Sequence, residues 1–62
     1  MKKYALRDHW HKEFIEEVES YGMELEKDHF VFFQYDEEKK KLIKAVYNSR
    51  NWDLISVDNA TK

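Results

Sequence analysis

The chain has 62 residues, no cysteine and a formal net charge of −2, which leaves room for one small domain and excludes disulfides and thiolate metal sites. No run approaches the roughly 20 apolar residues of a membrane-spanning helix, and no apolar leader stands at the start, so we expect a cytoplasmic protein without membrane association. The material for a core is aromatic: two Trp, four Tyr and four Phe.

The N-terminal third of the chain is expected to contain a helix. Residues 1–7 are a candidate edge strand or an extended arm, and a helix over about 9–21 follows them. Asp8 is suited to cap its first turn, and Gly22, the only glycine, is suited to the left-handed residue that ends a helix. The apolar residues that recur at spacings of four, four and three, and so form the helical stripe, are Trp10, Phe14, Val18 and Tyr21.

The rest of the chain is expected to form strands. A short strand is indicated around Met23 and Leu25, and residues 58–62 are expected to fray. The segments 29–35, 42–47 and 52–57 are rich in β-branched and aromatic residues and are separated by short polar turns, which is typical of neighbouring antiparallel strands. The prediction is one α+β domain over 1–62, with the helix packed on a three-stranded meander to which residues 1–7 could add a fourth strand.

Both faces of this sheet carry large apolar side chains. Alternation in 29–35 sends Phe33 and Tyr35 to one face, and Phe30 and Phe32 to the other. A helix of about 13 residues is about 20 Å long and covers one face only. The other face is therefore either a mixed surface crossed by the N-terminal arm or a binding surface for a partner. The aromatic residues expected to contact that partner are Phe30, Phe32, Phe33, Tyr35, Tyr47 and Trp52.

A second surface is acidic. On the predicted helix, Glu13, Glu16 and Glu17 lie outside the apolar stripe and could meet a basic partner or remain an ordinary solvated face. From the two surfaces we expect a non-enzymatic, regulatory protein-binding module of the adaptor or inhibitor type. Its partner would be another protein or a second copy of the chain.

The alternative function is binding of single-stranded nucleic acid. Basic residues near the aromatic hairpin could hold phosphates while the rings stack on bases. These residues are Lys39, Lys40, Lys41, Lys44 and Arg50. The acidic residues 36–38 stand next to the lysines and reduce the positive field that such binding needs.

Catalysis and metal binding have weaker support in the sequence. His29 is the only candidate general base, and no serine stands in a nucleophile motif. His9 and His11 are two residues apart and would point in different directions on a helix, whereas a zinc site needs three or four converging ligands. We therefore expect no catalytic residue, no metal and no cofactor.

Overall fold

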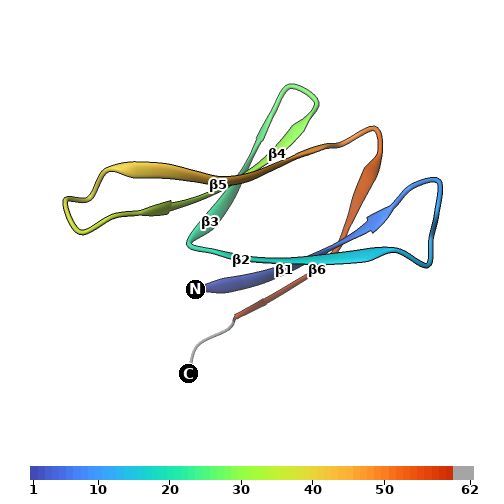
Figure 1. Ribbon diagram of the computed structural model, residues 1–62, viewed down its shortest axis with the longest axis horizontal. Helices are drawn as coiled ribbons and strands as arrows, with labels where there is room; N and C mark the ends of the chain where they lie inside the picture. The colour runs from blue at the N-terminus through green and yellow to red at the C-terminus, as the bar shows by residue number, and fades with distance from the viewer. Residues whose placement is uncertain (60–62) are drawn as a thin grey trace.

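The computed structural model describes residues 1–59, and all regular structure in this part of the chain is β-strand (Figure 1). The strands form two three-stranded antiparallel sheets, β2-β1-β6 (sheet A) and β3-β4-β5 (sheet B). Their bounds are β1 Lys2–Asp8, β2 Ile15–Ser20, β3 Gly22–Glu26, β4 His29–Tyr35, β5 Lys41–Asn48 and β6 Trp52–Asn59.

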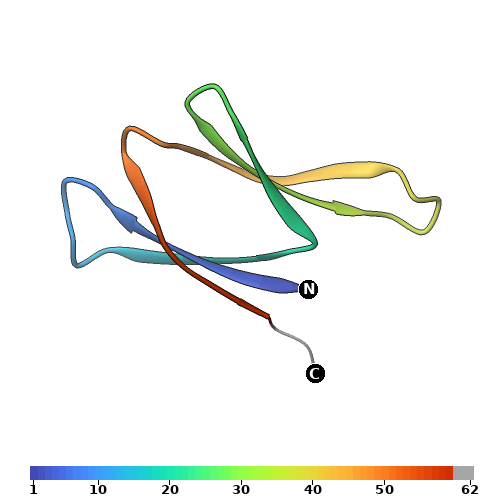
Figure 2. The ribbon, with the colours of Figure 1, turned by 180° about the vertical axis from the view of Figure 1, so that it is seen from behind.

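The chain crosses between the sheets twice. Tyr21 alone separates β2 from β3, so the strand ribbon leaves sheet A and enters sheet B at one sharp corner, visible from both sides (Figures 1 and 2). The chain returns from β5 to β6 through the turn 49–51. This turn lies beside the 9–14 loop, where the His9 amide donates to the Asn51 carbonyl at 2.7 Å.

The hydrophobic core lies between the two sheets. Tyr4, Leu6 and Val18 of sheet A meet Phe32 of sheet B, and the ring centroids of Tyr4 and Phe32 are 5.0 Å apart. Leu6 and Phe32 are fully buried, and each such side chain contributes about 1.5–3 kcal/mol by leaving water. Partly buried side chains extend this cluster: Met23, Phe30, Ala45, Tyr47, Trp52 and Leu54.

The prediction of an α+β fold with a helix over 9–21 is wrong. Residues 9–14 form a loop and Ile15–Ser20 form β2. Asp8 does make the bonds of a helix cap, because its Oδ1 accepts from the amides of Trp10 at 2.8 Å and His11 at 3.1 Å. The chain then closes a hairpin instead of a helix: the Asp8 amide donates to the Phe14 carbonyl at 3.0 Å.

The physical reason lies in β1. This strand is the centre of sheet A and buries Tyr4 and Leu6, so it needs a hydrogen-bonded neighbour on both sides. A helix over 9–21 would remove the neighbour that β2 supplies. Within β2 the inward side chains are Val18 and Ser20, which follow the strand period of two.

The predicted three-stranded meander is wrong as an arrangement, because its three segments belong to two different sheets. Strands are present over 29–35, 42–47 and 52–57, and β4 pairs with β5 as expected. β6, however, pairs with β1 rather than with β5, so the candidate strand at residues 1–7 is central rather than an edge. The expected fraying tail, 58–62, belongs to β6 as far as Asn59, and its remainder lies outside the described residues.

Two bulges change which residues share a face. In β5 the register shifts between Phe32 and Phe33, so that Phe32 faces Ala45 and Phe33 faces Ile43, with Lys44 as the extra residue. In β6 a similar shift makes Ile55 the extra residue. Simple alternation beyond these points therefore assigns the wrong face.

Candidate protein-binding surfaces

The outer face of sheet B, which is turned away from sheet A, carries an apolar and aromatic surface. Pairing of Gly22 with Phe33, of Phe33 with Ile43 and of Val31 with Val46 fixes which side chains share it. Within residues 1–59, no strand or helix packs over this face (Figures 1 and 2). Its apolar and aromatic members are Tyr21, Val31, Phe33, Tyr35, Ile43 and Val46.

Phe33, at the centre of this face, is covered by its own neighbours and is only 8% exposed. The rings of Tyr21 and Tyr35 have centroids 6.2 and 5.8 Å from that of Phe33. Lys41 reaches over the ring, with Nζ 4.5 Å from the centroid and 2.8 Å from Glu24 Oε1. The hydrogen bond to Glu24 raises the pKa of Lys41, so this bridge over Phe33 is charged at neutral pH.

The Phe33 cluster leaves a hollow toward each end of the outer face. Tyr21, Tyr35 and Lys39 line one of them, with a volume of about 450 Å³. Glu26, Lys27, His29 and Val46 line the other, with a volume of about 620 Å³, which we call the Val46 hollow. Because Val46 is 52% exposed, an apolar floor is open to a partner there.

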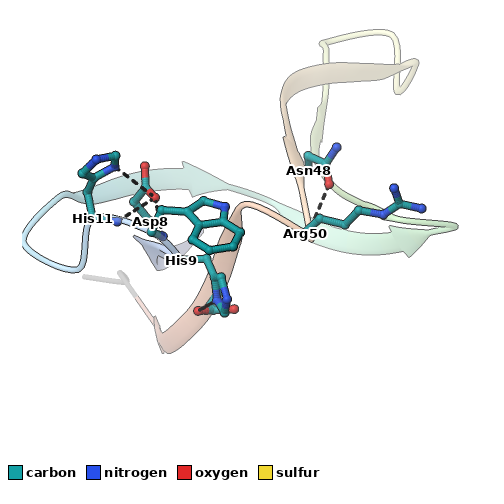
Figure 3. A network of polar contacts seen from close by, with 7 residues as sticks. Asp8, His9, His11, Asn48 and Arg50 are labelled. Carbon is teal, nitrogen blue, oxygen red and sulfur yellow. Dashed lines mark hydrogen bonds and ion pairs between the residues drawn. The ribbon is translucent and has the colours of Figure 1, made fainter.

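A second exposed aromatic surface is the loop 9–14, which we call the Trp10 loop. Trp10 is 71% exposed and Phe14 56% exposed. The backbone beneath them is nonetheless fixed by the Asp8 carboxylate (Figure 3) and by a bond from the Phe14 amide to the His11 carbonyl at 2.9 Å. Hydrogen bonds from the backbone amides of Trp10 and, to a smaller extent, His11 hold the pKa of Asp8 below its ordinary value.

The two histidines of the Trp10 loop point away from each other (Figure 3). His9 Nδ1 lies 3.3 Å from Asp53 Oδ2, and the His9 ring meets the Trp10 ring edge-on at 5.0 Å. His11 Nδ1 lies 3.9 Å from Asp8 Oδ1. In the described part of the chain no three His, Asp or Glu side chains come together as a metal site would require.

The structure divides the predicted aromatic contact residues between the core and the outer face. Phe32 is buried between the sheets, and Phe30, Tyr47 and Trp52 pack against the same cluster. Phe33 and Tyr35 are on the outer face. The predicted set is therefore not one surface.

The three predicted acidic residues are not gathered either, because the helix that would carry them is absent. Glu13 is exposed in the Trp10 loop. Glu16 accepts a bond from the Tyr47 hydroxyl at 3.3 Å, and burial together with this carboxylate raises the pKa of Tyr47. Glu17 lies 3.8 Å from Lys3 across β1 and β2.

Most basic groups of the β4–β5 hairpin and the following turn already have partners within the chain. The ion pairs are Lys40 with Glu38 at 3.7 Å, Lys41 with Glu24 at 2.8 Å and Arg50 with Asp28 at 3.0 Å. Lys44 donates to the Glu19 carbonyl, which satisfies an edge acceptor of β2. These contacts reduce the charge available for phosphate.

Sequence reasoning missed four exposed residues of the two surfaces. The sequence places Trp10 and Tyr21 in the helical stripe, and strict alternation in 42–47 would put Ile43 and Val46 on opposite faces. The missed signal at Trp10 is local: Asp8 precedes six residues in which only Trp10 and Phe14 are apolar, which is typical of a loop closed by an Asx turn. Nothing in the sequence marks the bulge at Lys44.

Comparison of the chain with models of protein families, with curated proteins and with solved structures found no match. Among the described residues there is no helix with the length and apolar character needed to cross a membrane. The functional assignment therefore depends on the geometry of the surfaces themselves.

Proposed function

We propose that this protein is a small non-enzymatic protein-binding module, of the adaptor or inhibitor type, whose contact surface is the outer face of sheet B. The observation that carries the proposal is the exposure of Ile43 and Val46, which are 55% and 52% exposed on a sheet face without a covering element. They lie on the same face as Val31 and Phe33, which are packed by their neighbours and only 9% and 8% exposed. A partner would complete the layer that the chain leaves open.

The chemistry of the face supports a protein partner. An apolar, aromatic centre with charged groups at its margin is the anatomy of protein–protein interfaces. Here the margin is supplied by Glu24, Glu26, Lys39 and Lys41. Two carboxylates and two ammonium groups are present there, so the field at this face is mixed in sign.

Binding of single-stranded nucleic acid stays a prediction, and the ion pairs do not favour it. Affinity for phosphates depends on basic groups that can release counterions. Lys41 and Arg50 instead face carboxylates of the same chain at 2.8 and 3.0 Å.

The proposal also includes a cytoplasmic location for the module.

Photo-crosslinking in the native cell tests the proposed surface. A photoreactive residue at position 43, in the middle of the outer face of sheet B, should form a discrete crosslinked protein species. The matched control places it at Ser56, which pairs with Ala5 on the opposite side of the molecule and is exposed. Equal yields of the same species at both positions, or no protein species at position 43, would overturn the proposal.

An oligonucleotide titration separates the two functional classes. Binding of a single-stranded oligomer that weakens steeply with added salt would replace the proposal with the nucleic-acid alternative. Under the proposal, the titration shows no saturable binding at about 0.15 M salt.

A further inference from the structure

We infer that one occupant of the outer face of sheet B is a second copy of this chain, whose Trp10 loop binds in the Val46 hollow. Two features of the same molecule support this inference. Trp10 projects from its loop and is exposed, and the exposed side chain of Val46 forms the apolar floor of a hollow. The inference rests on the proposed function, because it names a partner for that surface.

The Trp10 loop has the properties of a preorganised anchor. Trp10 is 71% exposed, while the backbone amides of residues 10, 11 and 14 are held by bonds of 2.8, 3.1 and 2.9 Å. The edge-on contact with His9 also restricts the indole. The loop backbone therefore has little conformational entropy left to lose on binding, and Trp is one of the residues enriched among interface hot spots.

The Val46 hollow is a suitable receptor for such a ring. It is an open depression of about 620 Å³ lined by Glu26, Lys27, His29 and Val46. Val46 pairs with Val31 on the outer face, and the His29 ring also lines the hollow. The hollow therefore offers both apolar contact and a surface for stacking.

Charges next to the loop and the hollow are complementary. Lys12 and Glu13 follow Trp10 in the loop, and Glu26 and Lys27 form the rim of the hollow. Within residues 1–59, none of these four groups has an ion-pair partner. Lys12 opposite Glu26 and Glu13 opposite Lys27 give two favourable pairs in one orientation, which sets the register of the contact.

The contact is head-to-tail rather than symmetric. The Trp10 loop joins β1 to β2, the hollow lies at the turn between β3 and β4, and both views place these two turns at different corners of the molecule (Figures 1 and 2). A copy that uses its loop on one neighbour keeps its hollow free for another. Such an interface builds chains or closed rings.

Sedimentation of the full chain over a range of concentrations tests the inference. The wild type should show an average mass that rises with concentration. Trp10→Ala and Val46→Glu should each lower self-association by at least about tenfold, since each removes one half of the contact. Ile55→Ser, which changes a side chain that is 41% exposed on β6, is the matched control and should associate like the wild type.

Mixing the two variants gives the decisive result. Trp10→Ala keeps the hollow and Val46→Glu keeps the loop, so an equimolar mixture should form a 1:1 dimer that does not grow further. Circular dichroism of each variant checks its fold, and Val46→Ser replaces Val46→Glu if the charged variant unfolds.

Three results would overturn the inference. These are a wild type that stays monomeric up to millimolar concentration, variants that associate like the wild type, and a mixture that stays monomeric. The proposed function is tested separately, because a crosslink from position 43 to a different protein would support it even if the chain is monomeric.

Discussion

The ring of Phe33 packs directly on the backbone of Gly22. A Cβ atom at position 22 would lie 2.9 Å from Phe33 Cζ, closer than carbon atoms pack. Among residues 1–59 no glycine has a positive φ, so Gly22 serves close approach rather than a left-handed turn. β3 is at the edge of sheet B, and the Phe33 ring covers backbone that the glycine leaves bare.

Replacing Gly22 by Ala is therefore expected to destabilise the protein by about 1 kcal/mol, at the low end of overpacking effects. In an unobstructed strand the same change would stabilise by roughly 0.5–1 kcal/mol, because glycine loses more backbone entropy. Denaturant unfolding measures the change. The double variant Gly22→Ala, Phe33→Leu removes the obstructing ring, so the alanine should cost less there than in the wild-type background. A gain in stability from Gly22→Ala alone would contradict the packing described.

Lys27 occupies a position that favours glycine. It is one of two non-glycine residues with positive φ in the described chain, at 54°, and it stands in the two-residue turn between β3 and β4. Lys27→Gly should raise the free energy of unfolding by about 0.5–1 kcal/mol, since relief of left-handed strain exceeds the added chain entropy. Lys27→Ala keeps the Cβ atom and is the matched control. Equal stability of the two variants would show that the backbone is not strained there.

The Trp10 loop should lose stability in acid. Amide donors lower the pKa of Asp8 in the folded state, so its contribution is present above the unfolded value of about 3.9 and is lost as the pH falls through the lower folded value. Asp8→Asn retains an oxygen acceptor without the charge. Its unfolding free energy should therefore fall less than that of the wild type between pH 6 and pH 2, measured by denaturant unfolding. Parallel pH profiles for the two proteins would contradict this role of Asp8.

The strands were more predictable than their arrangement. Segment 29–35 has the composition and alternation of a strand and is one, because local preference and tertiary packing agree there. At Trp10, Phe14 and Val18 they disagree: the spacing is helical, but burial of Tyr4 and Leu6 in β1 requires a strand beside it. Asp8 illustrates the difficulty, since the same two amide bonds can start a helix or close a hairpin.

The proposed binding surface could be predicted only in part for a similar reason. Phe33 and Tyr35 follow from strand parity, but placing Ile43 and Val46 with them requires the bulge at Lys44. The position of a bulge is determined by how the strands pair across the sheet, and no residue type in 41–48 indicates it. The pairing of β6 with β1 is equally non-local, because their residues are about 50 positions apart in the chain.

Substitution of Phe32 should reduce the stability of the fold, whereas substitution of Ile43 should reduce partner binding and leave the fold intact. Strand alternation in the sequence does not distinguish these two roles. Phe32 is fully buried between the sheets and packs on the rings of Tyr4 and Tyr47 at 5.0 and 5.8 Å. Phe32→Ala should therefore cost about 3–5 kcal/mol. A 62-residue domain has a total stability of roughly 3–9 kcal/mol, so much of this variant should be unfolded at 25 °C.

Ile43→Ser changes a side chain that is 55% exposed and should alter stability by no more than about 1 kcal/mol, while weakening any contact made through the outer face of sheet B. Circular dichroism with denaturant titration reports the fold, and the crosslinking yield from position 35, with the photoreactive residue placed there, reports the contact. A Phe32→Ala variant that stays folded but no longer binds its partner would show that Phe32 is on the contact surface. It would therefore overturn the assignment of the two sheet faces. An unfolded Phe32→Ala beside a folded Ile43→Ser with reduced crosslinking is the result expected from the packing, because only the outer face can lose apolar area without opening the core.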